Sequence, residues 1–361
     1  MKVLYMYGFY WPVVGGVELG VMELFRHLRK RGHDFLVVTS DLGRLPARDV
    51  HEGVEIRRLP LQTLFEKPDP LQLLQLSKQM AQLKREYAPD LVHFSFNDPL
   101  ALLHLQSHST HPCPTLVWIQ NPTYPSIGPE SLTHRLLTHA ERTVVTCESH
   151  RLSWGRAVPS ARIEVIPNAV ALPPEPGEPS QPPLLLGLGR LNAVKGFDLA
   201  VEAMPAILKA HPEASLRLVG DGPERGRLEA RVRQLALQEK VEFTGMVNPD
   251  KIWEHYRQST LVLAPSRLEG MPYVLLEAGA SARPVVASRV DGNAEAVLDG
   301  ETGLLMAPES VQELVGHTIR LLDEPMLARR LGCQARRRIA HEFTVEGFVD
   351  AFERLYFELV A

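Results

Sequence analysis

The sequence lacks the features that define several classes of protein. Its 361 residues include only three cysteines, Cys113, Cys147 and Cys333, and no two of them are close together. This excludes a disulfide-stapled scaffold and predicts a reducing, cytoplasmic compartment. No stretch approaches the roughly 18 consecutive apolar residues that a membrane-spanning helix needs.

The sequence also has little excess of one charge sign over the other. The formal net charge is −4, and charged residues make up 23% of the chain. A nucleic-acid-binding domain usually carries a strong basic surplus, and neither half of this chain does. We therefore expect no nucleic-acid partner.

Apolar residues are plentiful, at 45% of the chain, so a large core can form, and the length favours two domains. Short β-branched runs alternate with longer amphipathic segments, first at residues 3–6, 18–31 and 35–39 and then throughout the chain. This alternation is typical of parallel sheets covered by helices on both faces. It predicts an α/β protein with two doubly wound, Rossmann-like domains.

One stretch interrupts this alternation. Residues 171–183 read ALPPEPGEPSQPP, with six prolines in thirteen residues, which disfavours both helix and central strand. We predict a linker at 171–183 between an N-terminal domain at 1–170 and a C-terminal domain at 184–343. The remaining residues, 344–361, show helical apolar spacing and need a surface to pack against.

The segment 265–278, PSRLEGMPYVLLEA, carries the strongest indication of a site. It follows an apolar strand, turns at Gly270, and places Pro272 where a proline in the first helical turn is expected. The helix N-terminus and the free backbone N–H groups of Gly270 and Met271 would suit a phosphate. Glu269 and Glu277 are acceptors for sugar hydroxyls, and their separation suggests two parts of one extended ligand.

Two cations follow the first strand of the second domain. In GRLNAVKG, Arg190 comes directly after the strand and Lys195 precedes a glycine that opens a helix. Together they could neutralise a diphosphate. No Asp-x-Asp pair occurs in the chain, so we predict no metal in the site. In the first domain, Gly15 and Gly16 form a loop that lets backbone approach a ligand closely.

These motifs occur in the order found in one large enzyme family. They are GGVE, DLVHFS, VIPNAV, GRLNAVKG, LVGDGPER, FTGMV and SRLEGMPYVLLEA. Nearly the whole chain resembles a retaining, metal-independent glycosyltransferase of family 4 with the GT-B fold. That fold implies two domains facing each other across a cleft, with the last helix, 344–361, crossing back onto the first domain.

The resemblance also implies roles for the matching residues. Arg190 and Lys195 would bind the donor diphosphate, while Glu277 would hold the nucleotide ribose and Glu269 would contact the donor sugar. Three backbone segments would also contact the donor. Gly270, Met271 and Pro272 would meet the sugar and phosphates, and Gly245, Met246 and Val247 would lie under the base. Gly15 and Gly16 would lie against the diphosphate. The resemblance also implies that no cofactor is needed. It implies retention by same-face attack, with the leaving phosphate taking the acceptor proton, so that no protein nucleophile is required.

One position departs from the family pattern. Many members have a histidine at the end of the strand before the acceptor loop, and the aligned residue here is Gln120. An amide can hydrogen-bond a sugar hydroxyl but cannot exchange a proton. His93, placed after the preceding strand, is then the nearest ionisable candidate, and we group it with Gln120 and Glu269 as the catalytic candidates.

Three functions fit these residues. The favoured one is transfer of a hexose from a UDP- or GDP-linked donor to a hydroxyl acceptor such as a growing polysaccharide, a lipid-linked saccharide or a metabolite. The second, motivated by Gln120, is a non-catalytic nucleotide-sugar-binding protein of the same fold. The third is an epimerase acting on the sugar nucleotide itself, which the glutamate pair disfavours.

Two further clusters have a functional and a structural interpretation. A zinc site could use His104, His108, His111 and Cys113, but the segment runs into a Pro-flanked loop without a general-base glutamate, so we expect no metal there. A peripheral membrane contact for a lipid-linked acceptor could use the cations at the end of the first helix, Arg26, Arg29, Lys30 and Arg31. We favour a solvated helix end for these cations.

Overall fold

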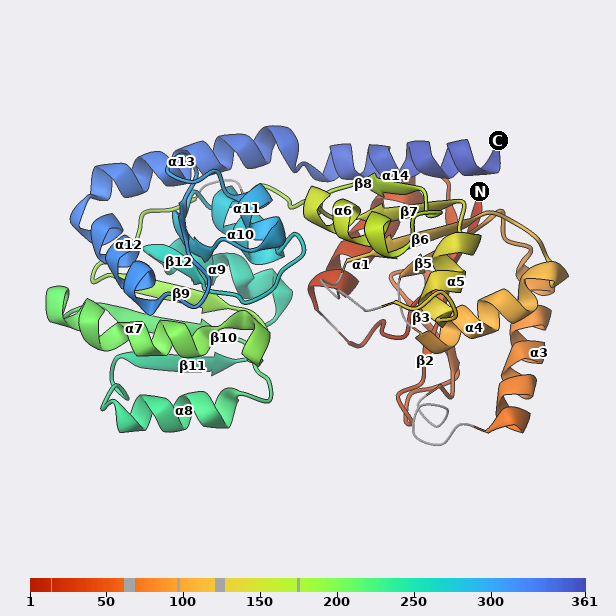
Figure 1. Ribbon diagram of the computed structural model, residues 1–361, viewed down its shortest axis with the longest axis horizontal. Coiled ribbons are helices and arrows are strands. Elements are labelled where there is room, and N and C mark those ends of the chain that lie inside the picture. Colours follow the sequence, from red (N-terminus) through yellow and green to blue (C-terminus); the bar gives the residue numbers. More distant parts are fainter. Residues whose placement is uncertain (14, 62–68, 96–97, 121–126, 174–175) are drawn as a thin grey trace. The chain divides into compact units, whose positions relative to one another are not determined.

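The computed structural model describes residues 1–13, 15–61, 69–95, 98–120, 127–173 and 176–361. The chain divides into two compact units (Figure 1). The first comprises Met1–Pro167 and Glu346–Ala361, and the second comprises Asn168–Val345. Each unit is an α/β layer structure built on one sheet, which confirms the prediction of two doubly wound domains.

The sheet of the first unit has eight strands in the order β3-β4-β2-β1-β5-β6-β7-β8. All neighbouring pairs are parallel except β3 with β4. The strands are β1 Lys2–Met6, β2 Asp34–Ser40, β3 Arg48–His51, β4 Val54–Leu59, β5 Leu91–Ser95, β6 Thr115–Ile119, β7 Arg142–Val145 and β8 Ile163–Val165. Strands β5 and β6 are buried along their whole length, and β1 is buried from Val3 onward, because helices cover both faces of a parallel sheet.

The helices of the first unit connect these strands. They are α1 Gly16–Lys30, α3 Pro70–Tyr87, α4 Asp98–Ser107, the 3₁₀ turn η1 His108–Thr110, α5 Leu132–His139, α6 Glu148–Ala157 and α14 Val345–Val360. Side chains cap two of them: Asp69 accepts from the N–H of Leu71 at α3, and Ser131 accepts from the N–H of His134 at α5.

The hairpin of β3 and β4 was not predicted. Its two turn residues, Glu52 and Gly53, have φ angles of 48° and 76°. Positive φ at both central residues is the geometry of the tight two-residue turn that joins antiparallel strands. The Glu-Gly pair between the alternating residues of β3 and β4 was therefore a local signal for this hairpin.

The last helix, α14, packs on the first unit with an apolar stripe. Phe348, Phe352, Leu355 and Tyr356 are all buried. The ring of Phe352 lies 4.8 Å from that of Trp118 in β6, centroid to centroid. The outer face of the helix is held by ion pairs from Arg31 to residues 350 and 353.

The second unit has six parallel strands in the order β11-β10-β9-β12-β13-β14. They are β9 Leu184–Leu188, β10 Ser215–Val219, β11 Val241–Gly245, β12 Leu261–Ala264, β13 Val285–Ser288 and β14 Leu304–Met306. The helical elements are η2 Ala193–Lys195, α7 Phe197–Ala210, α8 Arg225–Gln234, η3 Pro249–Lys251, α9 Ile252–Gln258, α10 Tyr273–Ala280, α11 Asp291–Ala296, α12 Val311–Asp323 and α13 Pro325–Glu342. The direction of winding reverses between β9 and β12, so right-handed crossovers place α7 and α10 on opposite faces of the sheet.

The proline-rich stretch, expected to be a linker, is part of the second unit, whose boundary falls after Pro167. Buried Arg283 fastens it, since one guanidinium nitrogen donates to the carbonyls of Pro176 and Gly177 at 2.7 and 2.9 Å. Arg336 donates to the carbonyl of Pro173 at 2.7 Å. Extended proline-rich backbone leaves its carbonyls unpaired, so two arginines can bind it to the unit.

Candidate functional site

The loops after β9 and β12 form the centre of the second unit's site. The two strands are neighbours, and the strand order reverses between them. In open α/β sheets such a switch point opens a crevice at the carboxyl ends of the strands, where ligands bind. The β9 loop carries Arg190 and Lys195, and the β12 loop carries Glu269; of these, Lys195 and Glu269 meet at this edge, while Arg190 is exposed.

Gly196 allows the two loops to approach each other. Its φ is +64°, and a Cβ atom built on it would lie 2.0 Å from the carbonyl oxygen of Pro265. A larger residue would have to push the β12 loop away while adopting a left-handed backbone. This is the physical reason for a glycine after Lys195.

Lys195 and Glu269 form an ion pair. The ammonium nitrogen of Lys195 lies 2.6 Å from Oε1 of Glu269, and their side chains are 24% and 8% exposed. The hydroxyl of buried Ser266 donates to the same oxygen at 2.7 Å. Both contacts use Oε1, so Oε2 of this carboxylate has no partner among these three groups.

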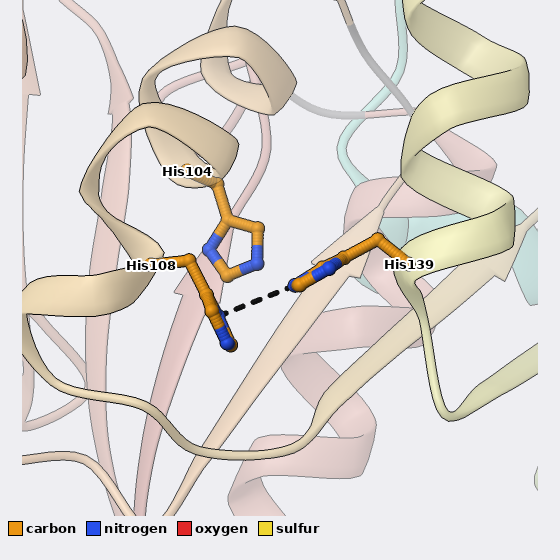
Figure 2. Close-up of side chains that lie close together, drawn as sticks. All are labelled: His104, His108 and His139. Carbon is orange, nitrogen blue, oxygen red and sulfur yellow. Dashed lines mark hydrogen bonds between the residues drawn. The ribbon is translucent and has the colours of Figure 1, made fainter.

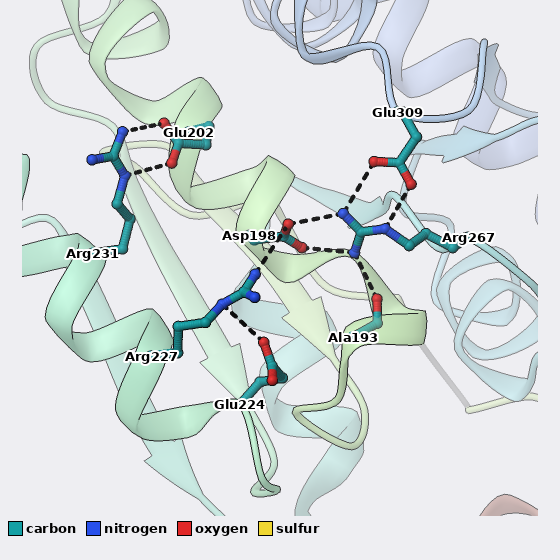
Figure 3. Close-up of polar contacts among 8 residues, drawn as sticks. All are labelled: Ala193, Asp198, Glu202, Glu224, Arg227, Arg231, Arg267 and Glu309. Atoms are coloured by element: carbon teal, nitrogen blue, oxygen red, sulfur yellow. Dashed lines mark hydrogen bonds and ion pairs between the residues drawn. The ribbon is translucent and has the colours of Figure 1, made fainter.

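Arg267 holds the two loops together (Figure 3). Its backbone N–H donates to the carbonyl of Val194, and its guanidinium donates to the carbonyl of Ala193 at 2.6 Å. The guanidinium also makes two bonds to Asp198 and two to Glu309, all between 2.6 and 3.0 Å. Paired in this way, Arg267 lowers the pKa of the Asp198 carboxyl and has its own pKa raised.

The geometry around Arg267 fixes the backbone on both sides of Lys195. Arg267 is only two residues from Glu269, and Ala193 and Val194 directly precede Lys195. The arginine therefore sets the distance between the lysine and the glutamate. Sequence reasoning did not single it out, although it lies inside the SRLEG motif.

Glu277 lies in α10 and is half-buried. The hydroxyl of fully buried Tyr256 donates to its Oε2 at 2.6 Å. Burial raises the pKa of Glu277, and the bond from Tyr256 opposes that rise. The carboxylate is thus oriented by a neutral donor from α9, a residue that sequence reasoning missed because it is 21 positions away.

The start of α10 differs slightly from the prediction. Pro272 has ψ of 129°, outside the helical range, and is the N-cap, so the helix begins at Tyr273. The preceding backbone is held from another motif: the side-chain amide of buried Asn168, in VIPNAV, donates to the carbonyl of Met271 at 2.7 Å. On the other side, a Cβ on Gly292 would overlap the carbonyl of Gly270. The segment Gly270 to Pro272 is buried and immobilised on two sides.

Arg190 and the β11 end lie at the surface of the second unit. Arg190 is exposed directly after the β9 loop's glycine. Gly245 ends β11 with φ of +74°, Met246 is 70% exposed, and Val247 is half-buried. An exposed methionine beside a left-handed glycine is a surface that a flat apolar group can cover, which suits the predicted contact with a base.

In the first unit, Gly15 is the N-cap of α1 and Gly16 its first residue. The carboxylate of buried Glu18 lies over this end, so a Cβ on Gly15 would come within 2.7 Å of its Oε2. Burial raises the pKa of Glu18, while hydrogen bonds from Tyr7 and the backbone of Gly15 oppose the rise. The predicted approach of Gly15 and Gly16 to a diphosphate stays a prediction.

The structure does not support His93 as a proton-exchanging residue. It lies inside β5 rather than after it and is 0% exposed. Its Nδ1 is 2.5 Å from the hydroxyl of Tyr356, and its ring stacks on Phe352. Burial lowers the pKa of His93 to about 3, so the ring is neutral and closed off from solvent by α14.

Gln120 directly follows β6. Both polar atoms of its side chain are shielded from solvent, and neither has a hydrogen-bond partner among the residues that the structure describes. The next six residues, 121–126, lie outside the described part of the chain. The role of Gln120 toward a sugar hydroxyl therefore stays a prediction.

The basic helix end of α1 is engaged in structural contacts. Arg26 pairs with Glu23 and Glu52, and Arg29 donates to the backbone carbonyl of Glu52. With Arg31 bound to α14, three of the four cations have partners within the first unit. In the described part of the chain, no helix is both long and apolar enough to cross a membrane.

Comparison with known proteins assigns the family. The model described as Glycosyltransferase Family 4 matches residues 14–172, and the model described as Glycosyl transferases group 1 matches residues 171–338. Together they span most of the chain and meet where the proline-rich stretch begins. The chain belongs to the family 4 glycosyltransferases of GT-B type.

Relatives and solved structures agree with this assignment. The chain is 25% identical to the N-acetyl-alpha-D-glucosaminyl L-malate synthase of Bacillus anthracis, over 97% of this chain and 96% of that protein. It is 28% identical to the D-inositol 3-phosphate glycosyltransferase of Acidothermus cellulolyticus, over 94% of this chain and 85% of that protein.

Among solved structures, sucrose-phosphate synthase from Thermosynechococcus elongatus shares the fold with a TM-score of 0.86 at 23% identity, covering 99% of this chain and 98% of its own. Anabaena Alr3699/HepE, solved in complex with UDP and glucose, gives 0.76 at 20% identity, covering 99% of this chain and all of its own. The family models and the curated relatives show that the chain is a glycosyltransferase, which favours the enzyme over the non-catalytic binding protein.

Proposed function

We propose that this enzyme transfers a hexose from a UDP- or GDP-linked donor to a hydroxyl acceptor, with retention of the anomeric configuration and without a metal ion. The observation that carries the proposal is the convergence of Lys195, Ser266 and Glu269 at the switch point of the second sheet. At that edge a cation lies beside a carboxylate that can accept hydrogen bonds from sugar hydroxyls. This pair suits the point where a diphosphate is joined to a hexose.

The diphosphate is assigned to Lys195 and Arg190. Both follow β9, one as a point charge and one as a planar fork with several donors. Charge develops on the diphosphate as the bond to the sugar breaks, and fixed cations stabilise that charge directly. These side chains take the part that a divalent ion plays in other transferases, which is why we propose metal independence.

The ribose and the sugar are assigned to the two glutamates. Glu277, oriented by Tyr256, accepts hydrogen bonds from ribose hydroxyls, and Oε2 of Glu269 accepts from a hydroxyl of the hexose. Because Lys195 already engages Oε1 of Glu269, the carboxylate is neutralised in place and does not repel the diphosphate. The acceptor proton passes to the leaving phosphate, so no protein base such as His93 is needed.

Relatives support a nucleotide-sugar donor. The relative from Mycolicibacterium smegmatis is named a GDP-mannose-dependent alpha-mannosyltransferase, and the Anabaena structure is solved with UDP-glucose in another crystal. Both donor bases therefore occur among similar proteins. The acceptor class is a glycan, a lipid-linked saccharide or a metabolite, and the three free cysteines support a cytoplasmic location.

A donor panel tests the proposal. Purified enzyme is incubated with UDP- and GDP-hexoses in EDTA, and nucleotide release is followed with and without candidate acceptors. We expect thermal stabilisation and turnover with one donor class, and a loss of about 10- to 150-fold in kcat/KM for Glu277→Gln, because a hydrogen bond to a charged group contributes about 1.5–3 kcal/mol. Lys209→Met, an exposed site on α7, is the control and should match wild type.

Two outcomes would overturn the proposal. One is the absence of binding and turnover for every donor. The other is a product formed from the donor without any acceptor, which would indicate the epimerase hypothesis.

A further inference from the structure

Three histidines of the first unit lie together (Figure 2). His104 and His108 come from α4 and η1, one helical turn apart, and His139 is the last residue of α5. One ligand atom from each lies within 4.8 Å of the others. In the described part of the chain, no other group of three or more histidine, cysteine or acidic residues is this close.

The spacing within the cluster matches metal ligation. Nδ1 of His108 and Nε2 of His139 are 3.2 Å apart, with the two rings nearly perpendicular at 85°. Two imidazole nitrogens on one tetrahedral zinc, each about 2.0–2.1 Å from the metal, are separated by roughly 3.3 Å. The pair already holds this distance, and the third nitrogen needs a shift of about 1.5 Å or less to reach it.

We propose that His104, His108 and His139 bind one divalent transition-metal ion that favours imidazole, with Zn²⁺ as the expected ion. The remaining coordination position falls to solvent. No carboxylate belongs to the cluster to act as a general base, so the site is structural: it ties α4 and η1 to α5 on one side of the first sheet. The proposal does not rest on the proposed donor-binding residues, none of which belongs to this cluster.

The surroundings of His104 supply the outer contacts of such a site. Its Nδ1 lies 3.1 Å from the ammonium of Lys84 and its Nε2 lies 3.0 Å from the hydroxyl of Thr115. Only the hydroxyl can accept a hydrogen bond from a ring N–H, so ligation displaces Lys84 and keeps the contact with Thr115. Metal-bound histidines usually keep a partner on the second nitrogen, which fixes the ring. The nearby charges are Lys84 and Glu141, whose carboxylate accepts from the backbone N–H of Thr115 at 2.6 Å.

Burial agrees with this geometry, since His104 is buried and His108 and His139 are half-buried. The set differs from the one that the sequence brings to mind. Nε2 of His111 donates to the carbonyl of Pro89, 2.9 Å away, and His139, far along the chain, takes the place of His111 in the cluster.

The test uses the full chain without an affinity tag, freed of metal by EDTA and dialysis. Zn²⁺ is titrated by calorimetry, and Co²⁺ by visible absorption, where a four-coordinate ion gives intense d–d bands. We expect one equivalent of either ion. His108→Asn and His139→Asn should each weaken binding at least tenfold, because loss even of an outer partner of a ligand costs about 10- to 100-fold.

His134→Asn is the matched control, since His134 lies in α5 outside the cluster. Circular dichroism in EDTA verifies folding, and His108→Gln replaces any variant that fails to fold. Single-site binding lost in the cluster variants and kept in the control supports the proposal. It is overturned by the absence of stoichiometric binding, or by equal affinities in wild type and the cluster variants.

Discussion

Replacing Lys195 by methionine removes one cation from the proposed diphosphate site while keeping the length and most of the volume of the side chain. The Lys195 side chain is 24% exposed and its ammonium lies 2.6 Å from Oε1 of Glu269, so the charge is held in one place. A bond from such a group to a phosphate oxygen contributes about 1.5–3 kcal/mol, which corresponds to a loss of affinity of roughly 10- to 150-fold. The variant also leaves the Glu269 carboxylate unpaired beside the diphosphate, so we expect the upper part of this range.

The assay is calorimetric titration with UDP or GDP and, separately, with the corresponding nucleoside. The nucleoside has no phosphate for Lys195 to contact, so the substitution removes no interaction with it. Its affinity should therefore change less than about twofold. Lys209→Met serves as the control for a changed net charge, and urea unfolding verifies that the variant is folded. Equal losses for nucleoside and nucleotide, or no loss for either, would refute the assignment of Lys195 to the diphosphate.

Three further predictions follow from the contacts. Tyr256→Phe removes the hydroxyl that opposes the raised pKa of Glu277, so the pKa rises further and the pH profile of donor binding moves to higher pH; an unchanged profile would contradict this role. In Arg267→Lys the single ammonium cannot bridge both acidic partners and the Ala193 carbonyl. Urea unfolding should show a decrease of about 1–2 kcal/mol in the free energy of unfolding, after allowing for the partial exposure of the side chain. An unchanged free energy would show that the network does not stabilise the protein. Burial lowers the pKa of His93 to about 3 in the folded protein, below the value of about 6.5 in the unfolded chain. The neutral ring therefore contributes its full stabilisation to the folded state above pH 6.5, and this stabilisation is lost as the pH falls. His93→Asn should therefore reduce the pH dependence of unfolding free energy by about 1.4 kcal/mol per pH unit between pH 6 and 5, and an unaltered slope would count against the buried neutral ring.

The fold was predictable because each central strand is a continuous apolar run. Residues 3–6, 115–119 and 261–264 have few polar positions, since both faces of a parallel sheet are covered. The edge hairpin at Arg48–Leu59 was missed because its alternation is short and rich in charge. The proline-rich stretch was read as a linker because the two arginines that fasten it lie more than a hundred residues away.

The site was predictable where one motif carries both the backbone turn and the functional side chain. Lys195 and Glu269 belong to such motifs, and the switch point brings them together. Tyr256 and Arg267 were missed because their roles depend on tertiary contacts that leave no local pattern. The sequence places His93 near the end of a strand, where it could face either a ligand or a packed helix. Only the packing of α14, whose Tyr356 contacts His93, shows that the ring is buried in the core.

The central claim is metal-independent transfer with retention at a site of protein cations. The most direct measurement is ¹H NMR of the first-formed product from an α-linked donor, recorded in EDTA, which also empties the histidine site. An α-linked product formed at the rate seen without EDTA is the predicted result. A β-linked product would contradict it, and so would turnover that stops in EDTA and returns with a divalent ion in the His108→Asn variant, which lacks the histidine site.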